Sequence, residues 1–408
     1  MGLIVQKFGG SSVADADKLR NVARIITETY RAGHSVVAVL SAQGDTTDDL
    51  IAKAAQINPK ASRREMDMLL STGEQISCSL CAMAIEGMGY PVLSMTGWQA
   101  GFRTDSAHSN ARIKKINTER ILAELDKKAI VIVTGFQGVD KYDDITTLGR
   151  GGSDTSAVAL AAALHADLCQ IYTDVDGVYT ADPRTVAGAR KLEEITYDEM
   201  LELASLGAQV LHNRSVEMAK RYNVNLEVLS SFTGTPGPKV KEVVNTVEKS
   251  HVSGVAKDTN VARVAVVGVA DEPGIAFKIF SLLAKKSINV DLILQSIGRH
   301  NTKDISFTID RADMAAVKQM LEERKDYIRF DHVDVTDGVA KISIVGAGMV
   351  HSPGVAAKMF EALYSAGINI QMISTSEIKV SVLVDREDAS AAVQAVHDRF
   401  YGEMSDRA

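Results

Sequence analysis

The chain has 408 residues, with 45 Lys and Arg against 52 Asp and Glu, which gives a formal net charge of −7. Hydrophobic residues make up 46% and charged residues 24%, so a wholly disordered, collagen-like or coiled-coil chain is excluded. The acidic balance argues against nucleic-acid binding through a basic surface. A mean hydropathy of zero, without a long apolar run, argues against a membrane span or a membrane partner.

The N-terminus, MGLIVQKFGG, has no basic region followed by a long apolar stretch, so we expect no signal peptide. Three Cys make no disulfide framework, which favours a reducing, cytoplasmic location. Cys78 and Cys81 lie one helical turn apart, and we interpret them as small buried hydrophobes rather than a redox pair. Two further ligands for zinc are missing nearby, and we expect no resident metal site.

Apolar strands alternate with helices over the first half of the chain. The predicted strands are 3–8, 35–40, 90–95, 129–133, 168–173 and 223–230, and the predicted helices are 15–32, 66–87 and 155–165. Strands that are apolar throughout need cover on both faces, so the pattern predicts a mainly parallel sheet sandwiched by helices, an α/β fold. The sequence FTGTPG at 232–237 breaks the pattern and is interpreted as a domain edge.

The second half contains an internal repeat. The copies begin at Val261 and Val339, and each runs strand, Pro-Gly turn, amphipathic helix, Ile-Asn turn, strand, then strand and helix. We interpret each copy as a ferredoxin-like βαββαβ unit. The predicted domains are therefore 1–245, 261–335 and 339–408, with 246–260 as a linker or first strand of the regulatory region.

Four loops at predicted strand ends carry glycine and polar residues. P-loop, protein-kinase and dinucleotide-binding motifs are absent from the sequence. In the first loop, Lys7 precedes Gly9, Gly10 and Ser11, where open backbone N–H groups suit an anion and a Lys can reach a phosphoryl group. The alternative is a tight turn beside a surface Lys.

The second loop, Ser41 to Thr47, follows an apolar strand at the edge of the sheet where ligands of α/β proteins bind. An ordinary loop with a helix cap is the alternative. Glu74 begins an apolar helix, where a carboxylate complements the helix dipole or binds a substrate ammonium group.

The third loop, LGRGGSD, opens an Ala-rich helix. Arg150 can hold a carboxylate through two parallel hydrogen bonds, and Asp154 either caps the helix or orients a Lys. The fourth loop, TDVDG, is typical of a turn; it weakly resembles a calcium loop, but the distal Glu is misplaced.

Taken in order, these segments resemble the aspartate kinase family of the monofunctional bacterial type. The resemblance is carried by KFGGSS, SAQGDTTD, STGEQ, TGFQG, GRGGSDTSA, TDVDGVYTADPR and SLGAQVLH, and in the repeat by DEPG…INVD and HSPG…INIQMIS, which resemble tandem ACT domains. It implies the amino-acid-kinase fold and transfer of the γ-phosphoryl of ATP, accompanied by Mg²⁺, to L-aspartate. The product would be 4-phospho-L-aspartate, which leads to lysine, threonine, methionine and diaminopimelate biosynthesis.

The resemblance also implies residue roles. Lys7 and Asp154 would be catalytic. ATP would contact Lys7, Phe8, Gly9, Gly10, Ser11, Ser41, Thr173, Asp174, Tyr179, Asp182 and Arg184. Aspartate would contact Asp45, Thr46, Thr47, Glu74, Arg150, Gly151, Gly152, Ser153 and Asp154. Gln43 stands where many members carry Met, and we expect the loop to tolerate it.

The resemblance to ACT domains implies feedback inhibition by lysine, threonine or both, which would bind at an interface between the repeats. Candidate effector contacts are Asp271, Asn289, Val290, Asp291, Gln295, Asn369, Ile370, Ser376 and Glu377. The two Asn residues are alternatively turn residues only. We expect a homo-oligomer or assembly with a short regulatory subunit, and, since the chain stops after the second repeat, no dehydrogenase half. Another kinase of the superfamily and a non-catalytic amino-acid sensor are the competing hypotheses.

Overall fold

The computed structural model describes residues 2–175, 177–206, 211–233, 236–242, 252–296 and 301–402. It divides into two compact units. The first comprises Met1–Val178, Lys191–Ala204 and Ala208–Thr246, and the second comprises Tyr179–Arg190, Ser205–Gly207 and Val247–Ala408. The stretch 179–190 thus belongs to the second unit, whereas the sequence analysis includes it in a continuous domain over 1–245.

An eight-stranded sheet forms the centre of the first unit, in the order β10-β12-β11-β9-β1-β2-β6-β3. The strands are β1 (Leu3–Phe8), β2 (Ser35–Leu40), β3 (Val92–Met95), β6 (Ile130–Thr134), β9 (Leu168–Thr173), β10 (Glu194–Thr196), β11 (Leu226–Ser230) and β12 (Pro236–Lys241). Neighbours from β11 to β3 are parallel, so the predicted parallel sheet is confirmed.

The predicted domain edge at FTGTPG is wrong. After β11 the chain reverses and pairs again as β12, antiparallel to β11. Pro236 and Gly237 thus begin a strand of this sheet rather than mark a domain edge, and Gly234 lies outside the described residues.

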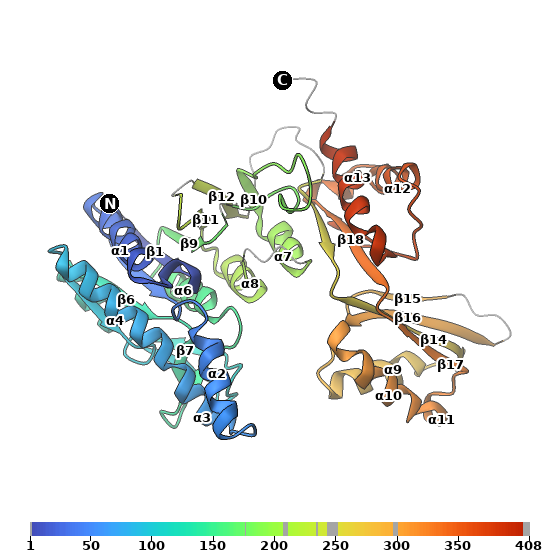
Figure 1. Ribbon diagram of the computed structural model, residues 1–408, viewed down its shortest axis with the longest axis horizontal. Coiled ribbons are helices and arrows are strands. Elements are labelled where there is room, and N and C mark those ends of the chain that lie inside the picture. The colour runs from blue at the N-terminus through green and yellow to red at the C-terminus, as the bar shows by residue number, and fades with distance from the viewer. Residues whose placement is uncertain are drawn as a thin grey trace. The chain divides into compact units, whose positions relative to one another are not determined.

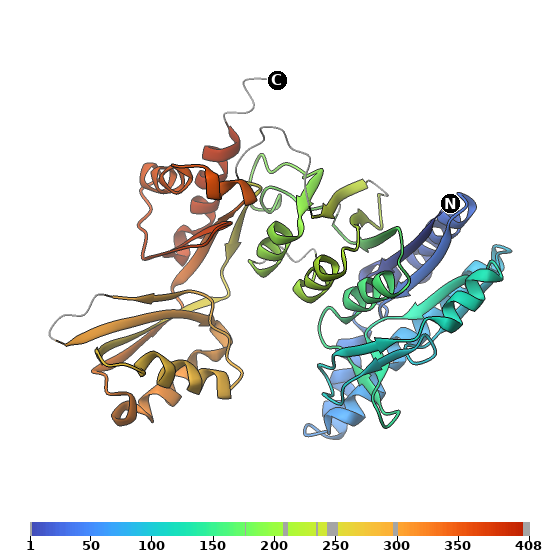
Figure 2. The ribbon, with the colours of Figure 1, turned by 180° about the vertical axis from the view of Figure 1, so that it is seen from behind.

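Helices cover both faces of this sheet (Figures 1 and 2). On one face α1 (Ala16–Arg31) and α4 (Thr72–Gly87) pack on each other and on β2, around a core that includes Leu40, Cys78 and Cys81. Cys78 and Cys81 are both buried in this core, which confirms them as small buried hydrophobes, and burial raises the pKa of Cys81 to about 12. On the other face α6 (Gly152–Ala163) packs on β1, β2 and β9 and is covered by α8 (Asn213–Tyr222). The remaining helices are α2 (Thr46–Ile57), α3 (Arg63–Leu70), α5 (Glu119–Asp126) and α7 (Tyr197–Ser205).

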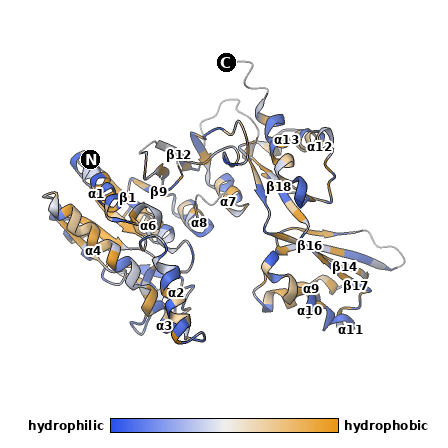
Figure 3. Cartoon of the chain, viewed as in Figure 1, coloured by the Kyte–Doolittle hydropathy of each residue, from blue (hydrophilic) through white to orange (hydrophobic). Residues whose placement is uncertain are grey.

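The predicted single helix over 66–87 is two helices, α3 and α4, that meet at Ser71. Its carbonyl accepts hydrogen bonds from Gln75 and from Gln137, at 2.9 Å for the latter. A tertiary contact of this kind leaves no signal in local periodicity. By length and composition the combined stretch 63–87 is apolar enough to cross a membrane (Figure 3). Asp67 and Glu74, which are buried, lie on this stretch, and 44% of its most apolar window is buried, while Ile76, Leu80 and Met83 are exposed.

A small second sheet, in the order β5-β4-β7-β8, lies beside α3 and escaped the sequence analysis. Its strands are β4 (Phe102–Thr104), β5 (Ile113–Ile116), β7 (Gln137–Val139) and β8 (Ile145–Thr147). Strands of three or four residues are too short to show a reliable alternation of apolar and polar positions.

Asp67 joins α3 to this sheet. Its carboxylate is fully buried and accepts hydrogen bonds from the backbone N–H groups of Ser109 and Thr147 at 2.9 and 3.0 Å, and from the Thr147 hydroxyl at 2.7 Å. A second side-chain partner, His108 Nδ1, lies 3.0 Å away. Two loops and a helix therefore depend on one carboxylate.

We predict that Asp67→Asn destabilises the protein by about 3 kcal/mol, because an amide turns one acceptor into a donor facing other N–H groups. Urea unfolding measures the change. Asp126→Asn, on an exposed position of α5, is the matched control and should shift unfolding little. Equal effects of the two substitutions would contradict the role given to Asp67.

In the second unit the first repeat forms a sheet in the order β15-β16-β14-β17. Its elements are β14 (Val261–Ala270), α9 (Ile275–Lys285), β15 (Ile293–Gln295), β16 (Thr302–Asp310), α10 (Met314–Glu322), α11 (Lys325–Ile328) and β17 (His332–Thr336). This is the predicted ferredoxin-like βαββαβ unit, and α9 and α10 pack over its apolar core.

The second repeat has the sheet order β13-β18-β20-β19. Its elements are β18 (Val339–Val345), α12 (Val355–Ser365), β19 (Met372–Thr375), β20 (Lys379–Asp385), α13 (Ala389–Tyr401) and β13 (Gly254–Asp258). The predicted βαββαβ order is wrong for this copy, since its edge strand β13 precedes the first repeat in sequence. Short 3-10 helices are η1 (Gly10–Val13), η2 (Arg311–Asp313), η3 (Ala347–His351) and η4 (Arg386–Asp388).

Candidate active site

One row of residues runs straight across the first sheet. Phe8 of β1 is aligned with Leu40 of β2 and with Tyr172 of β9, and Leu40 is aligned with Thr134 of β6. These strands are parallel, so the loops that follow them leave the sheet at the same edge. The predicted motifs at 9–12, 41–47 and 173–174 are therefore brought to one place.

The first two loops are packed together. Gly10 must be Gly, because a Cβ there would lie 2.8 Å from the carbonyl oxygen of Ala42. Gly44 N–H donates to the Gly10 carbonyl at 3.0 Å, and the Gln43 amide donates to the Val13 carbonyl at 2.8 Å. The polar residue that departs from the family pattern thus ties its loop to η1.

Lys7 and Asp154 form an ion pair with Nζ 2.6 Å from Oδ1, and each side chain is only 12% exposed. Lys7 lies on β1 and Asp154 in the first turn of α6. The Lys7 ammonium is also 3.4 Å from the position that a Cβ of Gly9 would take, so it lies over the glycine loop. Two residues far apart in sequence are joined at the predicted phosphate site.

Glycines let α6 approach this edge closely. Gly149 and Gly151 have φ of 79° and 70°, in the left-handed region, and a Cβ on Gly151 would lie 2.2 Å from the His212 ring. A Cβ on Gly135 would lie 2.7 Å from Ser153 Oγ. The Arg150 side chain is exposed beside this helix start. Gly152 is as confined as Gly135, with Phe136 2.8 Å from its notional Cβ.

Glu74 is the most perturbed acid at this edge. Its residue is 3% exposed, and Oε1 accepts a hydrogen bond of 3.2 Å from Ala42 N–H. Oε2 is buried and has no hydrogen-bond partner among the described residues. Burial raises the pKa of Glu74 to about 8, despite hydrogen bonds that favour its ionised form. An unpartnered buried oxygen of this kind is suited to a cationic ligand group.

The other predicted site residues of the first unit make fewer contacts that point to a ligand role. Phe8 is fully buried and stacks on Tyr172 with ring centroids 4.6 Å apart, so only its backbone can face a ligand. Asp45 is exposed at the start of α2, where the Thr46 hydroxyl donates to the Gln43 carbonyl at 2.6 Å. The remaining members in the first unit also lie at this edge: Ser11 in η1, Ser41 and Asp174 in loops, Thr47 in the first turn of α2 and Thr173 at the end of β9.

Tyr179, Asp182 and Arg184 lie in the second unit. The Arg184 guanidinium holds the pKa of Asp182 below its usual range through hydrogen bonds of 3.0 and 2.9 Å. Asp182 and Arg184 are both exposed.

The sequence analysis named no ligand contact in TGFQG, although it noted the motif. The Thr134 hydroxyl and the Gln137 Oε1 atom are buried without hydrogen-bond partners among the described residues. Their place directly after an apolar strand, like that of the other loops, was the available signal.

The predicted effector residues lie in four different settings. Asp271 pairs with Lys303 at 2.9 Å, and Asp291 pairs with Lys341 of the second repeat. Ser376 and Glu377 instead line a hollow of about 310 Å³ at the start of α12. Val290 and Ile370 pack against the cores of their own repeats, whereas Asn289, Asn369 and Gln295 are exposed.

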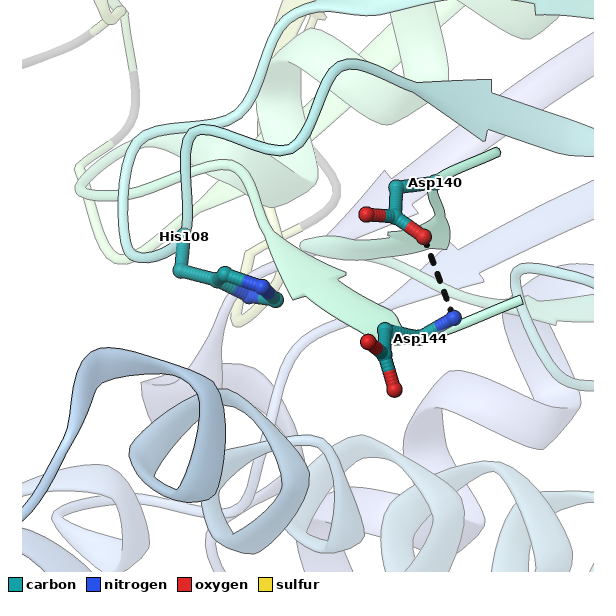
Figure 4. A group of neighbouring side chains, drawn as sticks. All are labelled: His108, Asp140 and Asp144. Atoms are coloured by element: carbon teal, nitrogen blue, oxygen red, sulfur yellow. Dashed lines mark hydrogen bonds between the residues drawn. The ribbon is translucent and has the colours of Figure 1, made fainter. Parts of the chain in front are cut away.

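His108, Asp140 and Asp144 have ligand atoms within 4.8 Å of one another (Figure 4). Each already has a partner: His108 lies against Asp67, Asp140 accepts from the Asp144 N–H at 3.1 Å, and Asp144 pairs with Arg64 at 2.6 Å. These pairs give the three side chains a structural role in holding neighbouring segments together, and we assign the cluster no metal.

Comparison with known protein families shows which class of protein this chain belongs to. The amino acid kinase family matches residues 2–230, and the ACT domain family matches 264–324 and 342–400. The chain is thus an amino acid kinase domain followed by two ACT repeats.

Individual relatives identify the family within this class of protein. Aspartokinase 2 of Bacillus subtilis is 51% identical over 400 residues, 98% of each chain, and the aspartokinase of Corynebacterium glutamicum is 50% identical over 405 residues, 98% of this chain and 96% of that one. The structure of Escherichia coli aspartokinase III in complex with aspartate and ADP is 27% identical, with a TM-score of 0.82 over 98% of this chain and 100% of that chain. The chain belongs to the aspartokinase family, whose members are ATP-dependent phosphotransferases that act on a carboxyl group of aspartate.

We predict that Glu74 makes stability depend on pH. With its pKa raised from 4.5 to about 8, the native state holds a proton that the unfolded chain releases above pH 4.5. Stability should therefore fall between pH 4.5 and 8, by up to about 1.4 kcal/mol per pH unit. Urea unfolding at pH 6 and pH 8 should show this slope for the wild type and lose it in Glu74→Gln. Glu86→Gln, exposed on the same helix, should keep it; parallel curves for all three proteins would refute the assignment.

Proposed function

We propose that the first unit transfers the γ-phosphoryl group of ATP to the β-carboxylate of L-aspartate, giving 4-phospho-L-aspartate and ADP. The observation that carries the proposal is the Lys7–Asp154 pair over the glycine loop, 2.6 Å between charged atoms. The E. coli relative that binds aspartate and ADP has the same fold over 98% of this chain.

The chemistry needs no general base. A β-carboxylate is ionised at neutral pH and is itself the nucleophile, so the difficulty is to bring two anions together. Lys7 offsets charge on the transferred phosphoryl group, and Asp154 holds the Lys7 ammonium in place. Backbone N–H groups of Gly9, Gly10 and Ser11 bind phosphate oxygens.

Aspartate is held at both ends. Its ammonium group binds the unpartnered Oε2 of Glu74, and this contact lowers the pKa of Glu74 and ionises it as the ligand arrives. Arg150 binds the α-carboxylate through two parallel hydrogen bonds. The backbone at Gly151 to Ser153 lies where aspartate meets ATP. Asp45, Thr46 and Thr47 also contact aspartate.

The nucleotide base and ribose lie against Thr173 and Asp174 of the first unit. Mg²⁺ accompanies ATP and neutralises phosphate charge. The donors present fit an ion held mainly by phosphate oxygens, since Asp154, the carboxylate beside the glycine loop, is already paired with Lys7.

We predict that Lys7→Ala lowers kcat at least a hundredfold with little change in the aspartate KM, because its charge is needed in the transition state. Arg150→Ala should instead raise the aspartate KM about tenfold or more. Acyl phosphate trapped as the hydroxamate, with aspartate and MgATP, measures both. Small and equal effects of the two substitutions would count against these roles. Turnover with glutamate or a nucleoside monophosphate in place of aspartate would favour another kinase of the superfamily.

Lysine, threonine or both inhibit the enzyme through the ACT repeats. One E. coli aspartokinase III structure, 26% identical with a TM-score of 0.78, is a complex with lysine and aspartate in a T-state. In this chain Ser376 and Glu377 face a hollow large enough for an amino acid, and a carboxylate there can bind an effector ammonium. An effector that binds one conformation better shifts the population toward it.

We predict that Glu377→Ala weakens inhibition at least tenfold while kcat and both KM values without effector stay unchanged. Titration with lysine, threonine and their mixture in the hydroxamate assay measures this. Glu387→Ala, an exposed acid in η4, should leave inhibition intact. Inhibition that persists unchanged in Glu377→Ala would remove the hollow as the effector site.

The biosynthetic role in lysine, threonine, methionine and diaminopimelate formation, the cytoplasmic location and assembly through the ACT repeats are proposed on the family resemblance. A homo-oligomer and a complex with a short regulatory subunit remain the two alternatives for assembly.

A further inference from the structure

The segment TGFQG, residues 134–138, has no role in the proposed function, yet two of its side chains are buried at the edge of the sheet that carries the site. Thr134 is 1% exposed and Gln137 is fully buried. Neither the Thr134 hydroxyl oxygen nor Gln137 Oε1 has a hydrogen-bond partner among the described residues. Buried polar atoms are rarely left without a partner, so these two atoms need one from a ligand or from an ordered water.

Glu74 lies on the side of α4 that faces the sheet. It precedes Cys78 by one helical turn, and Cys78 belongs to the core between α4 and the sheet. At the end of β2, Glu74 Oε1 accepts the hydrogen bond from Ala42 N–H. Glu74 Oε2 is a further buried oxygen without a partner among the described residues.

Thr134 faces the same helix, because it follows Ile132 at a spacing of two residues on β6 and so shares its face of the sheet. Ile132 belongs to the core that includes Cys78. In register, Thr134 is aligned with Leu40 of β2, two residues before the N–H group that binds Glu74. The Thr134 side chain therefore lies on the α4 side of the sheet, where β2 and β6 both end.

Gln137 reaches the start of α4 from the other direction. Its Nε2 atom donates to the Ser71 carbonyl at 2.9 Å, and Ser71 is three residues before Glu74. This first turn of α4 is packed closely on the loop after β2, since a Cβ on Gly73 would lie 2.8 Å from the Ala42 Cβ. Two side chains of TGFQG thus converge on the turn of α4 that carries Glu74.

The chemistry of the three groups selects the ligand. A carboxylate oxygen, an amide oxygen and a hydroxyl oxygen can all accept hydrogen bonds. A primary ammonium group has three N–H donors and no acceptor, which is one donor for each of these atoms. An anionic ligand group would instead place its own acceptors against theirs.

We propose that Thr134 and Gln137 are substrate-binding residues that complete, together with Glu74, a three-acceptor site for the ammonium group of aspartate. This inference rests on the proposed binding of aspartate at Glu74. It goes beyond that contact, because it makes the primary amine a determinant of specificity through three hydrogen bonds rather than through charge alone. A dicarboxylic acid without an amino group would leave three buried acceptors without donors and should bind weakly.

The experiment compares aspartate with succinate, which has the same two carboxylates but no ammonium group. Calorimetric titration of the full chain gives the Kd of each ligand for the wild type and for two variants of nearly constant side-chain volume, Thr134→Val and Gln137→Met. Each variant removes one acceptor. The Kd for aspartate should therefore rise about tenfold, while the Kd for succinate stays within about twofold of the wild-type value.

Thr27→Val is the matched control. Thr27 is another buried Thr of the first unit, on α1, and its hydroxyl donates to the Arg24 carbonyl at 2.9 Å. This variant should leave both Kd values unchanged. Gln137→Met also removes the hydrogen bond to the Ser71 carbonyl, whereas Thr134→Val removes no hydrogen bond among the described residues. Thr134→Val therefore decides the question if Gln137→Met does not fold.

An unchanged Kd for aspartate in folded Thr134→Val overturns the inference and leaves its hydroxyl to an ordered water. An equal rise for aspartate and succinate, or an equal rise in Thr27→Val, also overturns it, since general damage to the fold would do this. If the wild type binds aspartate but forms no acyl phosphate from aspartate and MgATP, the proposed phosphoryl transfer fails. The comparison of Kd values still decides the inference in that case.

Discussion

The ion pair between Lys7 and Asp154 is the interaction on which the site depends. A nearly buried ammonium beside a nearly buried carboxylate is stable only if each keeps the other within reach, because either charge alone would be costly in that environment. The pair joins the central strand to the start of α6. That approach in turn requires small residues where the helix start meets the neighbouring loop, at Gly135 and Gly152.

A pair of this kind also explains the charge balance of the edge. Asp154 fixes the Lys7 ammonium without removing all of its positive field, and the backbone amides around Gly10 add a weaker positive potential. Glu74, which burial keeps protonated near neutral pH, adds no opposing charge until a cation arrives. This edge of the sheet is thereby suited to anions, and Glu74 can bind the single positive group of an amino acid.

Sequence reasoning succeeded where a feature is local. Continuous apolar runs located β1, β2 and β9, and glycine after those strands located the loops that the sheet brings together. It failed where the local structure involves contacts with residues far away in sequence. The Ser71 carbonyl between α3 and α4 accepts a hydrogen bond from the distant Gln137, and Ala187, within residues 179–190, donates a hydrogen bond to Gln394 of α13. The second repeat was misread because its edge strand comes from another part of the chain; a local pattern cannot reveal which sheet a strand joins.

The path of β13 has a consequence for how the regulatory half can be cut. The first repeat is an insertion between β13 and the rest of the second repeat, so the two repeats are nested rather than serial. A fragment that begins at Val261 would lack β13 and leave β18 as an edge strand with unpaired backbone groups, and such an edge can pair with strands of other chains. During synthesis β13 leaves the ribosome first and must wait for the whole first repeat before its partner exists.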